Sequence, residues 1–272
     1  MRHAAFVATA VLGPMLGMAP LFAGVKIVSE NTDLATKKVT TDVILLDANR
    51  LRVDSDDGRS VMFLTDGGRN RMVMLDKAKN TYEEIDEQTM QQMGQQMSAA
   101  MAQMQAAMKN MTPDQRAMME KMMKGKMPQA AAAPPKTVYT AKGSGSVNGF
   151  SCNKYEGDLS GVKESEVCAA LPAQIKLTPA DLQIFEKMKE FSSSLVSALA
   201  NSPVKVSVPS KYGFDSGYEG FPIQKTDFDN GQATKRGELK SITRTNFTDA
   251  DFSLGNAKKV DLPIPGGRGK QR

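Results

Sequence analysis

The sequence predicts an α+β protein in which an antiparallel sheet is combined with a few helices. Short runs rich in β-branched and aromatic residues alternate with Asp, Asn and Gly turns in the first third of the chain and again after residue 136. A stretch rich in Gln, Ala, Lys and Met, all good helix formers, lies between them. With 272 residues and no evident internal repeat, we expect one folded domain over residues 24–265.

The first 23 residues are typical of a cleavable export signal. Arg2 and His3 give a positive start, an apolar run reaches Phe22, and Ala23 and Gly24 supply the small residues of a cleavage site. Glycines and prolines interrupt the run, which is barely as long as the roughly 20 apolar residues of a membrane span. We therefore expect a soluble periplasmic protein that begins at residue 24.

Composition disfavours several classes of function. His3 is the only histidine and leaves with the signal, which removes the usual general base of serine hydrolases and the commonest zinc ligand. The formal net charge of +5 is spread along the chain, a pattern that does not indicate nucleic-acid binding. We expect a protein that is not an enzyme, without cofactor, metal or nucleic-acid partner.

Five strand-like runs follow one another after the signal, at residues 39–46, 51–55, 60–65, 71–75 and 80–85. Asp, Asn and Gly clusters separate the runs, and this regular spacing predicts an antiparallel meander. Leu51 and Val53 alternate with charged residues, and Met72 and Met74 occupy alternate positions in a later run. The alternation predicts one apolar face and one largely wet face.

Residues 86–128 form a predicted Met-rich helical insertion. Thr112 and Pro113 have the features of a helix start, so we expect two helices, near 87–110 and 113–124. A flexible Ala/Pro linker is predicted at 129–135. Methionines recur at steps of three and four, which gives each helix a Met face. These are Met90, Met93, Met97, Met101, Met104, Met108 and Met111, then Met118, Met119, Met122 and Met123.

A face built of methionine admits several functions. Flexible, polarisable side chains suit a lid over an apolar groove or a surface for a partner protein. Thioether sulfurs also bind soft metals such as Cu(I), and exposed methionine reacts reversibly with oxidants. An ordinary packing face that uses methionine is the plainest alternative. We take the apolar lid as the leading hypothesis and leave the others open.

Cys152 and Cys168 are the only cysteines, and an oxidising compartment favours a disulfide between them. A turn near Ser160-Gly161 predicts a β-hairpin that sets Cys152 opposite Cys168 and Lys154 opposite Glu166. Redox-active pairs usually lie closer, as in Cys-x-x-Cys motifs. We therefore expect a structural disulfide.

The remaining elements follow from local signals. Strand character returns at 136–140 and within 147–170. Thr178-Pro179-Ala180-Asp181 predicts a third helix by its capping pattern. Its apolar stripe is Leu182, Phe185, Met188, Leu195 and Leu199. Asp229-Asn230-Gly231 predicts a hairpin between strands at 223–228 and 233–244, and residues 266–272 form a predicted basic tail.

Several segments carry a resemblance to a known group. They are Arg50 to Asp54, Pro113 to Met119, Asn148 to Tyr155, Glu166 to Cys168, Gly220 to Ile223, Asp251-Phe252 and Lys258 to Pro263. In this order they resemble an uncharacterised bacterial exported family. Its pattern is similar to that of the LolA/LolB and LppX group of periplasmic lipoprotein- and lipid-handling proteins.

The resemblance implies a curved half-barrel sheet whose apolar concave face, covered by helices, holds acyl chains. It supplies no catalytic motif and no ligand-contacting position. We therefore expect a non-catalytic carrier of a hydrophobic ligand, either a lipid or a lipoprotein acyl chain. The alternative is an envelope structural or stress protein whose Met helices bind a partner protein or Cu(I).

Overall fold

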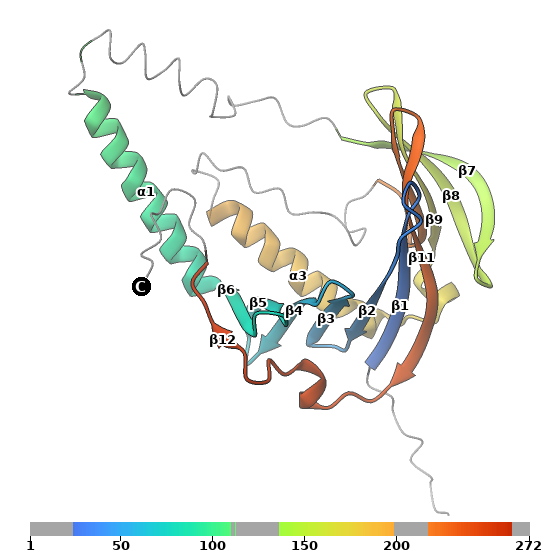
Figure 1. Cartoon of the computed structure of the whole chain (residues 1–272), viewed down its shortest axis with the longest axis horizontal. Helices are drawn as coiled ribbons and strands as arrows, with labels where there is room; N and C mark the ends of the chain where they lie inside the picture. The colour runs from blue at the N-terminus through green and yellow to red at the C-terminus, as the bar shows by residue number, and fades with distance from the viewer. Residues whose placement is uncertain (1–23, 110–111, 113–135, 199–216, 263–272) are drawn as a thin grey trace, which may run out of the picture.

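The structure, a computed structural model, describes residues 24–109, 112, 136–198 and 217–262. Over these residues the chain forms one large curved sheet with two α helices on its inner side (Figure 1). The predicted signal at 1–23, second Met helix at 113–124, linker at 129–135 and basic tail at 266–272 lie outside the described residues. Neither described α helix is long and apolar enough to cross a membrane.

Twelve described strands make one continuous sheet in the order β12-β6-β5-β4-β3-β2-β1-β11-β10-β9-β8-β7. The first six are β1 (Gly24–Asp33), β2 (Val39–Leu46), β3 (Arg50–Ser55), β4 (Arg59–Asp66), β5 (Arg69–Asp76) and β6 (Thr81–Asp86). The others are β7 (Val138–Val147), β8 (Phe150–Leu159), β9 (Val162–Ala170), β10 (Phe221–Asp229), β11 (Gln232–Thr245) and β12 (Lys258–Lys259). Every pair is antiparallel except β12 with β6.

The predicted meander is confirmed as β2 to β6, and the predicted hairpin around Asp229-Asn230-Gly231 as β10 and β11. The sequence did not reveal β1, whose second half is polar. This strand is nevertheless central, because it joins the N-terminal meander to β11 over residues 24–33. The two halves of the sheet are therefore connected by contacts between segments far apart in the chain.

Helix α3 (Pro179–Ala198) lies across the inner face of the sheet and forms the core with it (Figure 1). It follows a short 3-10 helix, η1 (Pro172–Ile175), and begins as predicted, with the Thr178 backbone N–H donating to Asp181 Oδ2 at 2.6 Å. The helix buries Ile184, Phe185 and Phe191 against the sheet, and the ring of Phe191 lies 5.6 Å from that of Phe63 on β4.

Helix α1 (Glu87–Lys109) follows β6 directly and runs away from the sheet (Figure 1). Its start is fixed by Asp86, whose Oδ1 accepts the backbone N–H of Thr89 at 2.7 Å. Near this start the helix contacts β5, β6 and α3. Met90 is buried in the core there, and Met93 is half-buried.

The expected wet outer face is wrong for β4 and β5. On that face Met62, Leu64, Val73 and Leu75 are buried in a second cluster with Phe252. In β5 it is Val73 that is fully buried, while Met72 and Met74 are half-exposed. The cover comes from the C-terminal strap, residues 246–260, which includes the 3-10 helix η2 (Asp249–Phe252). Local alternation cannot reveal a cover that lies nearly 200 residues away in the sequence.

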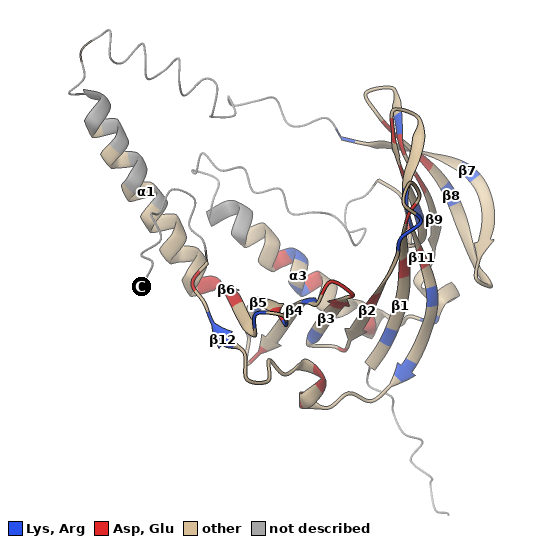
Figure 2. Cartoon of the chain, viewed as in Figure 1, with Lys and Arg blue, Asp and Glu red and all other residues tan. Residues whose placement is uncertain are grey.

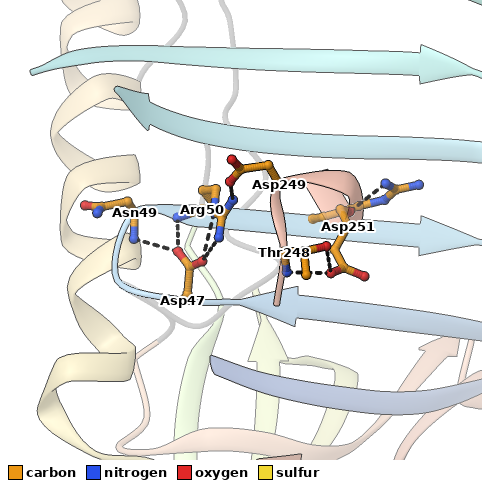
Figure 3. A network of polar contacts seen from close by, with 7 residues as sticks. Asp47, Asn49, Arg50, Thr248, Asp249 and Asp251 are labelled. Carbon is orange, nitrogen blue, oxygen red and sulfur yellow. Dashed lines mark hydrogen bonds and ion pairs between the residues drawn. The ribbon is translucent and has the colours of Figure 1, made fainter. Parts of the chain in front are cut away.

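Polar contacts fasten the C-terminal strap to the turn between β2 and β3 (Figure 3). Arg50 reaches Asp249 Oδ1 with Nη1 at 2.9 Å and Asp47 Oδ2 with Nη2 at 2.7 Å. Its guanidinium carbon lies 4.2 Å from the centre of the Phe252 ring. Arg52 donates from Nη1 to the backbone oxygen of Asp251 at 2.7 Å. One arginine, Arg50, therefore serves both an ion-pair network and an aromatic contact.

The disulfide between Cys152 and Cys168 is confirmed, but the predicted hairpin register is wrong. The turn Ser160-Gly161 places Leu159 opposite Val162, and a bulge at Gly157/Asp158 shifts the pairing further. Cys168 consequently lies opposite Lys154, and the disulfide runs diagonally between β8 and β9.

The predicted Lys154–Glu166 pair is wrong for the same reason. Glu166 lies opposite Glu156, and Lys163 contacts both carboxylates, at 2.5 Å and 3.4 Å respectively. A lysine between the two therefore offsets the repulsion of two like charges across the strands.

Candidate binding groove

An open groove with a volume of about 660 Å³ lies on the inner face of the sheet. Its walls come from β1, β2, β3, β10 and β11, which are neighbours in the sheet although the strands are separated by nearly 200 residues in the sequence. Since successive residues of a strand point to opposite faces, every second residue of these strands faces the groove. The lining is therefore built mainly of alternate residues from five strands, with consecutive residues at the end of β1 and beside the bulge of β10.

The inner end of the groove is apolar. Its floor consists of Ile27, Ile44, Val53, Ile223 and Leu239, one residue from each of the five strands. The same five residues belong to the core cluster that contains Ile184 and Phe185 of α3. Cross-strand pairing aligns Ile27 with Ile44 and Ile44 with Val53 in one apolar row, while Leu239 lies opposite Ser29, so that the floor continues diagonally across the sheet.

The groove-facing residues become polar toward the outer end of each strand. The next row along is Ser29, Asp42 and Ser55, which are paired across β1, β2 and β3. Further out lie Asn31, Thr40 and Lys225, and then Asp33, Lys38, Asp227 and Lys235. The groove thus grades from an apolar floor to a charged mouth, a polarity that suits an amphipathic ligand.

Irregularities in the sheet shape this part of the groove. Bulges interrupt β1 against β11 at Val28/Ser29 and β10 against β9 at Pro222/Gln224, both beside the floor. A bulge bends its strand and increases the local twist, which deepens a curved sheet. Gly237 keeps the centre open, because a Cβ atom there would lie 2.9 Å from Asn31 Oδ1.

Several charged side chains in the polar part of the groove lie beside a compensating partner. Burial lowers the pKa of Lys225, but the hydrogen bond and charge of Asp227, 2.8 Å away, raise it above its ordinary value. Burial raises the pKa of Glu238, and contacts with Lys240 and Gln224 more than offset this. The pKa of Asp33 is lowered, first by the backbone N–H of Thr36 and also by the charge of Lys235.

The two methionines of the predicted site whose side chains the structure describes, Met90 and Met93, do not belong to the groove. Met90 is buried in the core, and neither Met90 nor Met93 lines the groove. Met97, Met101, Met104 and Met108 belong to the part of α1 whose side chains the structure does not describe. Met111, Met118, Met119, Met122 and Met123 lie outside the described residues. The lid, partner and Cu(I) hypotheses therefore stay predictions.

The composition of α1 remains unusual in the structure. Between Glu87 and Lys109 the helix has no charged residue, and Figure 2 shows its described residues almost without charge while the strands carry many charged residues. At its base lies a smaller polar pocket of about 430 Å³, where Arg71 and Lys259 both contact Glu84, at 3.2 Å and 3.0 Å. The described residues contain no group of three or more His, Cys, Asp or Glu placed to hold a metal ion.

The groove was not predicted residue by residue. Its floor residues lie in segments with strand character, but only the pairing of β1 with β11 brings Ile27 and Ile44 beside Leu239 and Ile223. The one local signal is the change along each strand from apolar to polar at alternate positions, as in Ile44, Asp42 and Thr40. That signal would have marked β1 and β2 as strands that are apolar at one end and polar at the other.

Three solved structures show a distant similarity to the chain. An uncharacterised conserved protein from Thermus thermophilus has a TM-score of 0.42 at 9% identity, over 89% of this chain and 92% of that one. PNGF-II has a TM-score of 0.39 at 10% identity, over 88% of this chain and 31% of that one. The MucA/MucB complex of Pseudomonas aeruginosa gives 0.38 at 9% identity, over 88% and 58%.

The chain therefore spans less than two thirds of the length of the last two proteins. No protein-family model and no curated protein sequence matches it.

Proposed function

We propose that the protein is a non-catalytic carrier that holds a hydrophobic ligand, such as a lipid or a lipoprotein acyl chain, in the groove. The observation that supports this proposal is the apolar floor beneath an open cavity of about 660 Å³. Ligand sites commonly have volumes of about 300–1,000 Å³, mostly apolar walls and a few convergent polar groups. Burial of the ligand's apolar surface, at about 25 cal/mol per Å², would supply the affinity.

In this proposal the curved sheet acts as a half-barrel of the LolA/LolB and LppX kind, and the protein works in the periplasm. The disulfide between Cys152 and Cys168 supports export, because disulfides persist mainly in oxidising compartments. The polar residues of the groove lining favour binding over catalysis, because they show no arrangement that would activate a nucleophile. Among the described residues, neither Ser29 nor Ser55 has a hydrogen bond to a basic side chain that would activate its hydroxyl.

A matched pair of tryptophan variants tests the groove directly. Ser29 lines the groove beside its floor, whereas Ser241 on the neighbouring strand is exposed and does not line it. We expect Ser29→Trp to weaken binding of an uncharged fluorescent probe, N-phenyl-1-naphthylamine, by about tenfold or more through steric exclusion. Ser241→Trp should bind the probe like the wild type. Equal binding by all three proteins would place the probe elsewhere and contradict the proposal.

Native mass spectrometry of protein purified from the cell envelope would identify a natural ligand. We expect a bound species of lipid mass that is lost in Ser29→Trp and kept in Ser241→Trp. Wild-type protein that carries no ligand and binds no apolar probe would refute the carrier function.

A further inference from the structure

We propose that the groove selects a cationic amphiphile, a molecule with an apolar chain and a protonated amine, and that the amine binds Asp42. This inference rests on the proposed function, because it assigns the polarity of the ligand that the same groove holds. The apolar chain would lie on the floor around Ile44, and the amine would lie one row further out. Three features of the structure lead to this assignment.

The first feature is position. Two charged side chains follow the floor along their strands, each two residues beyond an isoleucine: Asp42 on β2, in the row of Ser29, and Lys225 on β10, one row further out opposite Gly237. A headgroup attached to a chain on the floor would reach these two side chains before any other charge. The sign of the charge that remains available at these two positions therefore decides the headgroup.

The second feature is compensation. Lys225 Nζ lies 2.8 Å from Asp227 Oδ1, so its charge is already paired. Asp42 has no ion pair among the described residues, and its hydrogen-bond donor is the uncharged amide of Asn31, with Nδ2 at 2.8 Å from Oδ2. A carboxylate accepts about four hydrogen bonds, so Asp42 retains acceptor capacity that faces the groove.

The third feature is the rest of the wall beside Asp42. Asp56, also in the lining, accepts the backbone N–H of Thr41 at 2.6 Å and has no ion pair among the described residues. Asp57 pairs with Arg59, and Glu238 pairs with Lys240. The uncompensated charge nearest to the floor is therefore negative and lies on the β2–β3 side, whereas Lys38 and Lys235, lining cations without an ion pair among the described residues, lie further out at the mouth.

An ammonium group placed at Asp42 would gain a charge-assisted hydrogen bond beside a low-dielectric floor. A carboxylate or phosphate at the same place would meet a like charge and would leave Asp42 desolvated. A hydroxyl could bond to Asp42 but would not neutralise it. The groove should therefore rank three headgroups on one chain in the order amine, alcohol, carboxylate.

The test uses dodecylamine, dodecanol and dodecanoate at neutral pH, the charged amphiphiles below their critical micelle concentrations and dodecanol below its solubility limit. Each is titrated against the probe bound to wild-type protein, Asp42→Asn and Asp229→Asn. Asn at position 42 keeps the shape and the contact with Asn31 while it removes the charge. Asp229→Asn makes the same change of net charge at an exposed turn outside the groove.

We expect the wild type to bind dodecylamine at least about fivefold more tightly than dodecanol, and dodecanoate most weakly. Asp42→Asn should abolish the preference for the amine, whereas Asp229→Asn should retain it. If all three amphiphiles displace the probe equally, or if Asp42→Asn keeps the preference, the cationic selectivity is refuted while the carrier function stands. If none of them displaces the probe, the proposed function itself fails.

Discussion

Arg244 on β11 contacts Asp181 in the first turn of α3 through both of its terminal nitrogens. Nη1 lies 2.7 Å from Asp181 Oδ1, and Nη2 lies 2.6 Å from Oδ2. The same Nη2 also donates to the backbone oxygen of Lys176, just before the helix, at 2.7 Å. Asp181 in turn accepts the backbone N–H and the hydroxyl of Thr178. This contact fixes the start of α3 on the strand that supplies Leu239 to the groove floor.

Removal of Arg244 should destabilise the protein more than removal of a neighbouring arginine. Arg244→Ala leaves the buried Asp181 carboxylate without its cation, a loss that typically costs about 3 kcal/mol. Arg236 on the same strand is exposed and donates from Nε to Thr226 Oγ1 at 3.2 Å, so Arg236→Ala should cost only about 1 kcal/mol of unfolding free energy. Urea unfolding followed by circular dichroism measures both. Equal effects of the two variants would show that the contact does not anchor α3.

The same contact predicts a pH dependence. Burial raises the pKa of Asp181, but the hydrogen bonds from Arg244 and Thr178 outweigh this, so the pKa lies below its ordinary value. The stabilisation is therefore complete above the unfolded pKa of about 3.9 and is lost as the pH falls through the folded value. The difference in unfolding free energy between the wild type and Asp181→Asn should shrink from pH 7 to pH 3. A constant difference over this range would contradict the assignment.

Much of the fold follows from local sequence. The limits of β2 and the starts of α1 and α3 depend on turn residues, Asp86 and the Thr178–Asp181 pair, all of which act within a few residues. The cysteine hairpin was predicted with the right turn and the wrong register. The two-residue turn at Ser160-Gly161 and the bulge at Gly157/Asp158 each shift the pairing by one residue, and Gly157 is the local residue that could have indicated the bulge.

The disulfide should contribute substantially to stability. Cys152 and Cys168 are 16 residues apart and both are buried, and closure of a loop of this size typically stabilises a protein by about 3 kcal/mol. We expect the Cys152→Ala/Cys168→Ala variant to lose about this amount in urea unfolding without reductant. Dithiothreitol should destabilise the wild type and leave the double variant unchanged. A double variant as stable as the oxidised wild type would show that the bond is not structural.

The groove could not be predicted from the sequence for a different reason. Ile27 and Leu239 are separated by more than 200 residues, and each belongs to an ordinary amphipathic run. Their common surface arises only when β1 pairs with β11. The methionine face, in contrast, is plain in the sequence, but only Met90 and Met93 have described side chains; Met90 packs in the core, and Met93 is half-buried.

These two methionines offer a test of how far packing explains the Met face. Met90 is 3% exposed, so Met90→Ala should cost about 2–4 kcal/mol of unfolding free energy through the cavity it leaves. Met93 is half-buried, and Met93→Ala should cost less than half as much. Replacement of Met90 by Leu, which conserves volume, should cost less than about 1.5 kcal/mol. If Met90→Leu lowered the unfolding free energy by much more than this, the thioether of Met90 would contribute something other than its volume.

Phe252 should hold the C-terminal strap against the outer face of the sheet. Its ring is 6% exposed, packs with Met62 and Val73, and faces the Arg50 guanidinium. Phe252→Ala should therefore lower the free energy of unfolding by about 3–5 kcal/mol. Phe252→Leu keeps much of the apolar contact but removes the ring beneath Arg50, so its cost should be clearly smaller.

Val260→Ala, at an exposed position near the end of the same strap, provides the control and should be close to neutral. Urea unfolding of the four proteins gives the comparison. If Phe252→Ala were as mild as Val260→Ala, the strap would not be part of the cooperative fold. Met62, Leu64, Val73 and Leu75 would then need another cover, since an exposed apolar face of that size on a sheet favours association between copies.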